Sequence, residues 1–242
     1  DETVIAKDLT GTSCTDKLDY YTSEWKKLGF QPDGIYTGFL SSEKQVDKIL
    51  DFINSFETEN TLVLVDPVMG DGGRTYSLFT DALACKMKKL VTVADVITPN
   101  LTECCILCNV DYCEFIKNAD KPDFMDKIAE LGKDLLNRYG VKIVIITGIE
   151  HKDIDGTMYV QNLIASKDEV FSVSCKKIGG SYSGTGDLFA SVMFSGLLRG
   201  DTLRDTVSLA VKFIETSLRD TVALGIDRNE GIEFEKHLKI LL

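Results

Sequence analysis

The sequence contains only two histidines, His151 and His237, among its 242 residues. Catalysis by a histidine base therefore has few candidates. No stretch approaches the about 18 consecutive apolar residues that a transmembrane helix needs, so we expect no membrane span. The opening residues, DETVIAKDLTG, lack the basic and apolar regions of a secretory signal peptide. We therefore expect a cytoplasmic protein.

Basic residues are fewer than acidic ones. The sequence has 27 Lys and Arg against 38 Asp and Glu, which gives a net charge of −11. Such a protein repels the phosphate backbone of nucleic acids, so we expect no nucleic-acid partner. An anionic substrate remains compatible with this charge if a local site reverses the field. Low-complexity runs are absent and 44% of the residues are hydrophobic, which favours one folded domain over residues 1–242.

The seven cysteines are an odd number, and we expect free thiols in a reducing compartment. Cys104, Cys105, Cys108 and Cys113 lie close together, and Cys105 and Cys108 have the spacing of half a zinc site. A second half-site and a nearby histidine are absent from this stretch. Buried thiols on a helix are the favoured interpretation.

Strands and helices alternate along the chain. Short apolar runs bounded by Gly, Pro, Asp or Asn predict strands, and apolar residues at helical spacing predict the segments between many of them. The predicted strands are Val4–Ala6, Gly34–Tyr36, Thr61–Val65, Ala94–Ile97, Val141–Ile146, Met158–Leu163 and Val170–Cys175. The predicted helices are Ser41–Phe56, Asp123–Tyr139, Thr185–Leu198 and Thr202–Leu218. This order predicts a mostly parallel sheet covered on both faces.

Polar segments follow three of the predicted strands. They are Asp66–Asp71, Thr98–Asn100 and Thr147-Gly148. Ligands of open α/β sheets bind beyond the carboxyl ends of the strands. The three segments therefore predict one crevice at that edge of the sheet.

A glycine-rich turn, Gly179–Gly186, precedes the apolar helix that begins near Thr185. Free amides and the helix dipole at such a turn predict an anion site suited to a phosphoryl group. Asp187 lies where a carboxylate could accept a proton from an attacking hydroxyl. The alternative is a simple helix-starting turn with Asp187 as a first-turn acid. The turn matches neither a P-loop nor a nucleophile elbow.

Two further groups of side chains have a chemical and a structural interpretation. Asp66 and Asp71 could hold Mg²⁺, and the glycines after Asp71 could let the loop act as a lid. The structural alternative is that this segment is only a surface turn. Asn100 and Glu103 could face one side of a helix. The local pattern favours an N-cap with a capping-box glutamate.

Taken together, these motifs resemble the ribokinase-like superfamily and, within it, the pyridoxal/pyridoxamine kinases. The resemblance is carried by Asp66–Asp71, Thr98–Glu103, Val144–Thr147 and Gly184–Asp187, in order from about residue 30 to about 220. It implies an α/β, ribokinase-like three-layer sandwich, with a mostly parallel central sheet flanked by helices. It also implies a homodimer and a kinase that phosphorylates a vitamin B6 vitamer with ATP.

The resemblance implies a role for each motif residue. Asp187 resembles the catalytic base that takes the proton from the 5′-hydroxymethyl group, and it touches the substrate. The amides of Gly184, Thr185 and Gly186 would form the anion hole for the transferred phosphoryl group. Three residues match positions that bind ATP phosphates and Mg²⁺, namely Asp66, Asn100 and Glu103. Of these, Asp66 and Glu103 are the two that the resemblance places at the metal. Asp71 matches a further position of the nucleotide loop.

The remaining implied positions surround the two ligands. Thr98 and Thr147 match positions near a monovalent cation, K⁺ or Na⁺, and Thr147-Gly148 also lies near the nucleotide. Tyr76 matches the lid tyrosine. Phe39 stands where tyrosine is frequent, which keeps an aromatic wall for the pyridine ring and loses a hydroxyl.

Two alternative functions stay open. Hydroxymethylpyrimidine phosphate kinase, of thiamin biosynthesis, has the same fold, but usually reads Gly-Thr-Gly-Cys in the anion hole and lacks the Gly-rich lid. Asp187 and Gly70–Gly73 favour pyridoxal kinase. A non-catalytic nucleotide- or vitamin-binding protein is the third possibility.

The N-terminal region departs from the family pattern. About 40 residues, with a Gly-rich loop, a helix and a second strand, are missing between about residues 11 and 16. We expect these residues to belong to the protein, and its intact mass would show them. A natural deletion would remove substrate contacts, and it motivates the non-catalytic alternative.

Overall fold

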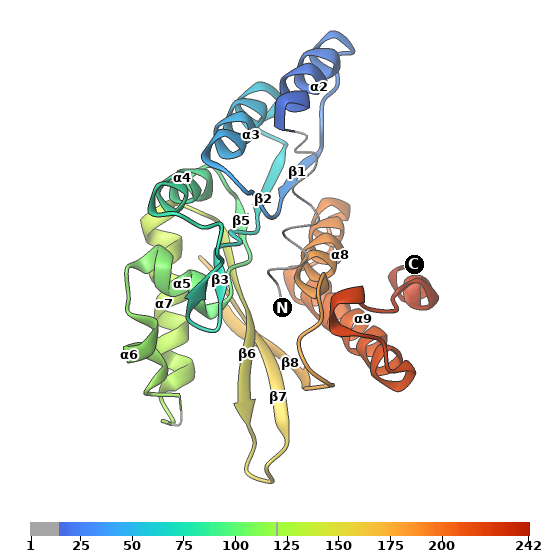
Figure 1. Ribbon diagram of the computed structural model, residues 1–242. Coiled ribbons are helices and arrows are strands. Elements are labelled where there is room, and N and C mark those ends of the chain that lie inside the picture. The colour runs from blue at the N-terminus through green and yellow to red at the C-terminus, as the bar shows by residue number, and fades with distance from the viewer. Residues whose placement is uncertain (1–14, 120) are drawn as a thin grey trace.

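The structure is a computed structural model that describes residues 15–119 and 121–242. The predicted strand Val4–Ala6 and most of the junction between about residues 11 and 16 lie outside the described residues. The described chain forms a central sheet with helices on both sides (Figure 1).

Six strands form the central sheet in the order β1-β2-β5-β6-β7-β8. Strands β1, β2, β5 and β6 are parallel, whereas β7 and β8 run antiparallel to their neighbours. Their bounds are β1 Gly34–Thr37, β2 Leu62–Val65, β5 Val96–Ile97, β6 Ile143–Lys152, β7 Met158–Ser166 and β8 Val170–Lys176. A separate hairpin pairs β3 (Gly70–Asp71) with β4 (Arg74–Thr75). The predicted mostly parallel sheet is confirmed.

Helices α2 to α7 and helices α8 and α9 lie on opposite sides of the sheet (Figure 1). The first group is α2 Thr15–Lys27, α3 Glu43–Phe56, α4 Asp81–Val91, α5 Leu101–Cys108, α6 Tyr112–Ile116 and α7 Phe124–Tyr139. The second group is α8 Thr185–Arg199 and α9 Leu203–Leu224, followed by the 3-10 helices η1 Arg228–Glu230 and η2 Glu235–Leu241. The three layers are the predicted α/β sandwich.

The central strands β2 and β5 and the first half of β6 are buried on both faces, which explains their continuous apolar runs. Val63 and Val65 of β2 face the core under α3, α4, α5 and α7, whereas Leu64 between them faces α8 and α9. Successive side chains of a strand point to opposite faces, so one run supplies both cores. Trp25 of α2 packs against Phe52 and Phe56 of α3.

Two elements extend six residues beyond their predicted ends. Strand β6 does not end at Ile146 but continues through a bulge to Lys152. The charged residues around His151 predict a solvated loop after the strand, but His151 instead pairs with Tyr159 in this hairpin and stacks on its ring. Helix α9 continues past Leu218 to Leu224 and ends at Gly225, whose φ is +67°.

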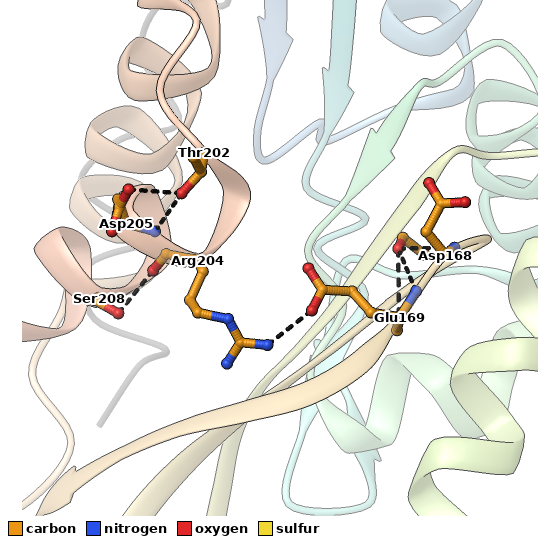
Figure 2. A network of polar contacts seen from close by, with 7 residues as sticks. Asp168, Glu169, Thr202, Arg204, Asp205 and Ser208 are labelled. Atoms are coloured by element: carbon orange, nitrogen blue, oxygen red, sulfur yellow. Dashed lines mark hydrogen bonds and ion pairs between the residues drawn. The ribbon is translucent and has the colours of Figure 1, made fainter.

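A polar network fastens α9 to the turn between β7 and β8 (Figure 2). The guanidinium of Arg204 donates to Glu169 over 2.7 Å and stacks 3.9 Å above the Phe171 ring. Thr202 caps the helix by accepting from the Asp205 amide. These contacts hold the second helical layer against the antiparallel strands.

Among the described residues, no helix combines the length and the apolar character that a bilayer-spanning segment requires.

Candidate active site

A cavity of about 220 Å³ opens beyond the carboxyl ends of β1, β2, β5 and β6. It is lined by Phe39, Asp66, Val68, Tyr76, Thr98, Asn100, Glu103, Thr147, Gly186, Asp187 and Phe189. Most of the residues singled out from the sequence therefore meet in one place. Asp71, Gly148, Gly184 and Thr185 do not line the cavity, and the individual roles stay predictions.

Asp66 follows β2 directly, and Thr98 follows the neighbouring β5. The Thr98 hydroxyl donates to Asp66 Oδ1 over 3.0 Å. Burial, reinforced by the negative charge of Asp187, raises the pKa of Asp66 to about 7, although the Thr98 bond acts in the opposite direction. No hydrogen bond joins Asp66 Oδ2 to a described residue, so this oxygen is available to a ligand.

Asn100 and Glu103 form the capping box at the start of α5, as the local pattern predicts. Asn100 Oδ1 accepts from the Glu103 amide, and Glu103 Oε2 accepts from the Asn100 amide over 2.8 Å. Glu103 Oε1 accepts from the Met69 amide over 3.0 Å. Burial, together with the charge of Asp66, raises the pKa of Glu103 to about 8. Glu103 thus has a structural role in addition to any contact with a ligand.

The hairpin β3–β4 is fastened over α5 and α6. Asn100 Nδ2 donates to the Gly70 carbonyl over 2.7 Å, and the Gly73 amide donates to the Thr102 hydroxyl over 2.9 Å. Gly73 has φ +78°, and a Cβ atom on it would lie 2.3 Å from the Tyr112 ring. Tyr76, just after β4, lines the cavity, whereas Asp71 is exposed on the hairpin and accepts from the Gly72 amide.

The glycine-rich turn places the start of α8 at the cavity. Gly184 has φ +81°, and no side chain caps the helix by a hydrogen bond. The Thr185 hydroxyl donates instead to the Tyr182 carbonyl over 3.0 Å. A Cβ atom on Gly184 or Gly186 would meet nothing within 4 Å, so the space beside both residues is open. Uncapped amides beside open space are suited to an anion.

Thr147 and Gly148 occupy the bulge of β6. The Thr147 amide donates to the Pro99 carbonyl over 2.9 Å, and Thr147 lines the cavity. Gly148 has φ +69°, is exposed, and donates its amide to Asn162 Oδ1 over 3.3 Å. The left-handed conformation at Gly148 lets the strand turn at the site before it continues.

Sequence reasoning missed Tyr36, Val68 and Phe189. The Tyr36 hydroxyl donates to Asp187 Oδ1 over 3.3 Å, although the residue was assigned only to a strand. Tyr36 lies near the carboxyl end of β1, and this position in the sequence could have indicated that its hydroxyl belongs to the site. Phe39, at the cavity edge, has 53% of its surface exposed.

The described lining contains three carboxylates and no Lys, Arg or His side chain. No group of three or more metal-ligating side chains is gathered among the described residues. Mg²⁺ usually takes only one or two protein carboxylates and completes its shell with waters and substrate phosphates. Asp66, with one free oxygen, fits that mode of binding. The buried thiols predicted on a helix are confirmed for Cys104, Cys105 and Cys108 of α5, but Cys113 on α6 is exposed.

Comparisons with known proteins identify the family of the chain. The model of the phosphomethylpyrimidine kinase family matches residues 25–231. Pyridoxal kinase of Arabidopsis thaliana is 28% identical over 78% of this chain and 58% of its own length. Hydroxymethylpyrimidine/phosphomethylpyrimidine kinase of Staphylococcus aureus is 27% identical over 81% of this chain and 66% of its own length. The chain thus spans between about half and two thirds of these curated relatives.

Solved structures share the architecture. A Bacteroides thetaiotaomicron structure with pyridoxal is 35% identical, with a TM-score of 0.84 over 97% of this chain and 80% of that chain. Pyridoxal kinase of Lactobacillus plantarum has a TM-score of 0.80 at 24% identity over 96% of this chain and 80% of that chain, which shows the common fold. The chain belongs to the phosphomethylpyrimidine kinase family and has the ribokinase-like fold of the pyridoxal kinases.

Proposed function

We propose that the protein transfers the γ-phosphoryl group of ATP to the 5′-hydroxymethyl group of pyridoxal, pyridoxamine or pyridoxine. The observation that carries this proposal is the arrangement of one cavity. Asp187 and the uncapped start of α8 share it with Asp66, Asn100 and Glu103. A proton acceptor, an anion site and carboxylates for a metal–nucleotide complex are the parts that phosphoryl transfer needs.

Each part has a defined task in the transfer. Asp187 accepts the proton of the substrate hydroxyl while the new oxygen–phosphorus bond forms and the bond to ADP breaks. The amides of Gly184, Thr185 and Gly186 stabilise the charge on the phosphoryl group. Phe39 provides an aromatic wall for the ring, and Tyr76 covers the cavity from the hairpin. Little more than positioning and charge stabilisation is required.

The charge of the site supports a cation requirement. Asp66 and Glu103 would hold Mg²⁺ together with the nucleotide phosphates, and Asn100, Asp71, Thr147 and Gly148 would lie along the nucleotide. When bound, Mg²⁺ neutralises charge that the described lining cannot, because the lining has no cationic side chain. Thr98 and Thr147 would lie near a monovalent cation.

Three observations favour a pyridoxal-type substrate. Asp187 replaces the cysteine usual in pyrimidine kinases, and the Gly70–Gly73 segment forms a hairpin over α5. A structure 35% identical to this chain contains pyridoxal. The second candidate is phosphorylation of hydroxymethylpyrimidine or its phosphate. It is favoured by the family model that matches residues 25–231.

An assay with Mg-ATP tests the proposal directly. We expect turnover of pyridoxal or pyridoxamine, and a loss of about 10³-fold in kcat for Asp187→Ala, because the general base is removed. Asp126→Ala is the matched control, since Asp126 is another exposed first-turn acid, on α7. Turnover of hydroxymethylpyrimidine alone would assign the protein to the second candidate. Nucleotide binding without turnover of any ring would assign it to a binding role.

The assembly and the cell compartment belong to the same proposal. We infer a single-domain, cytoplasmic homodimer from the family resemblance. Sedimentation of the purified protein measures the dimer, and a monomer at micromolar concentration would contradict it. The intact mass tests whether the protein contains the about 40 residues that the family pattern places between about residues 11 and 16.

A further inference from the structure

Tyr36 contacts the proposed catalytic base from a distant part of the chain. It lies in β1, 151 residues before Asp187, and its hydroxyl donates to Asp187 Oδ1 over 3.3 Å. The other carboxylate oxygen of Asp187, Oδ2, has no hydrogen bond to a described residue. One oxygen is therefore held and the other is free at the cavity.

The Tyr36 ring is fixed by packing. It contacts the ring of Phe194 at a centroid distance of 6.4 Å, and Phe194 is buried in α8. Asp187 and Phe194 are seven residues apart, so they lie on the same side of α8, about two turns from each other. The same helix thus provides both the support for the ring and the carboxylate that the hydroxyl contacts.

Gly38 lies beside this contact. A Cβ atom on Gly38 would lie 3.5 Å from the Tyr36 hydroxyl and 3.6 Å from Asp187 Oδ1. The backbone after β1 therefore passes beside both groups. Burial and the negative charges of Asp66 and Asp187 raise the pKa of Tyr36, so its hydroxyl keeps its proton and remains a donor.

We propose that Tyr36 is a positioning residue for the phosphoryl transfer. Its hydroxyl holds Asp187 Oδ1 and turns Oδ2 toward the hydroxyl of the substrate. Catalytic bases are commonly oriented by a third group in this manner. The distance of 3.3 Å is long for an O–H···O bond, and such bonds often tighten when the substrate is bound. This inference rests on the proposed function, and it applies equally to a pyridine or a pyrimidine substrate.

Tyr36→Phe tests the inference because it keeps the ring on Phe194 and removes only the hydroxyl. We expect kcat to fall about tenfold, with KM for ATP and for the vitamin within twofold of the wild type. Tyr139→Phe is the matched control. The Tyr139 hydroxyl donates to the Leu107 carbonyl over 2.9 Å, away from the cavity, so its loss should leave kcat unchanged.

A double-mutant cycle distinguishes positioning from other roles. In an Asp187→Asn background, Tyr36→Phe should have little further effect, since the two residues act as a unit. A kcat within twofold of the wild type for Tyr36→Phe would overturn the inference. So would a tenfold loss that persists in Asp187→Asn, or a rise in KM alone, which would indicate a substrate contact. A wild-type protein that phosphorylates no ring would overturn the proposed function itself, and this inference with it.

Discussion

At the scale of single residues, two carboxyl groups of the cavity, Asp66 and Glu103, have raised pKa values. Asp66 and Glu103 lie in a lining without Lys, Arg or His side chains among the described residues, and burial raises their pKa values to about 7 and about 8. Because the unfolded state releases these protons at lower pH than the folded state does, the stability of the folded protein falls as the pH rises toward the folded-state pKa values. Without a ligand, the burial of these two carboxylates therefore lowers the stability of the folded protein at neutral and higher pH. A bound cation would offset this loss of stability.

Asp66→Asn measures this loss of stability. Between about pH 4 and pH 7 the folded state keeps the Asp66 proton while the unfolded state releases it, so wild-type stability falls over this range as pH rises. The variant removes the charge but can keep an oxygen for Thr98. We expect its Tm to exceed that of the wild type by about 3–6 °C at pH 8, and by little at pH 4.5. Thermal unfolding in EDTA gives both values, and equal melting curves at pH 8 would contradict the expectation.

At the scale of elements, the hairpin β3–β4 owes its position to α5 and α6. Short two-stranded hairpins are marginal alone, so their neighbours decide where they lie. Here the Gly73 amide donates to Thr102 and the Gly73 backbone passes directly over the Tyr112 ring. A side chain has no room at that point. Tyr76, which follows β4 and lines the cavity, depends on this position of the hairpin.

Gly73→Ala should release the hairpin. The new Cβ atom would meet the Tyr112 ring and would also require φ +78°, a conformation that costs about 1 kcal/mol for alanine. Gly72→Ala is the matched control, because Gly72 has φ +58° and nothing within 4 Å of its Cβ position. We expect trypsin to cleave after Arg74 at least tenfold faster in Gly73→Ala than in Gly72→Ala. Equal cleavage rates would show that Tyr112 does not hold the hairpin.

At the scale of the whole molecule, one sheet joins two hydrophobic cores. Val144 and Ile146 of β6 belong to the core under α3, α4, α5 and α7, and Ile145 between them belongs to the core under α8 and α9. Neither core can lose its strands without exposing the other. We therefore expect both helical layers to unfold in a single transition.

Phe213→Ala tests this coupling. Phe213 of α9 is 1% exposed, and its truncation should destabilise the protein by about 3–4 kcal/mol. Trp25, the single tryptophan, packs against Phe56, which belongs to the core on the opposite side of the sheet, and reports unfolding there. Its fluorescence transition should shift down by about 8 °C, together with the far-UV circular dichroism. A shift in circular dichroism alone would indicate that the two layers unfold independently.

Much of the fold could be predicted because its signals are local. The helix predicted for Asp123–Tyr139 begins at Phe124 and ends before Gly140, since apolar periodicity and a terminal glycine are properties of the segment itself. Helix α4 was missed although Thr80 caps it and Leu83, Met87 and Leu90 have helical spacing. The continuation of β6 to Lys152 depends on pairing with β7, which no local pattern around His151 shows.

The sequence by itself determined the layer architecture, the family and the carboxyl-end location of the polar segments. These follow from periodicity, from turn residues and from the order of motifs along the chain. Only the tertiary structure decided which side chains meet. Tyr36 reaches Asp187 across 151 residues, and Glu103 holds the Met69 amide across 34. Such contacts depend on the packing of β1 against α8 and of the β2–β3 loop against α5, which is a property of the folded chain and of no segment alone.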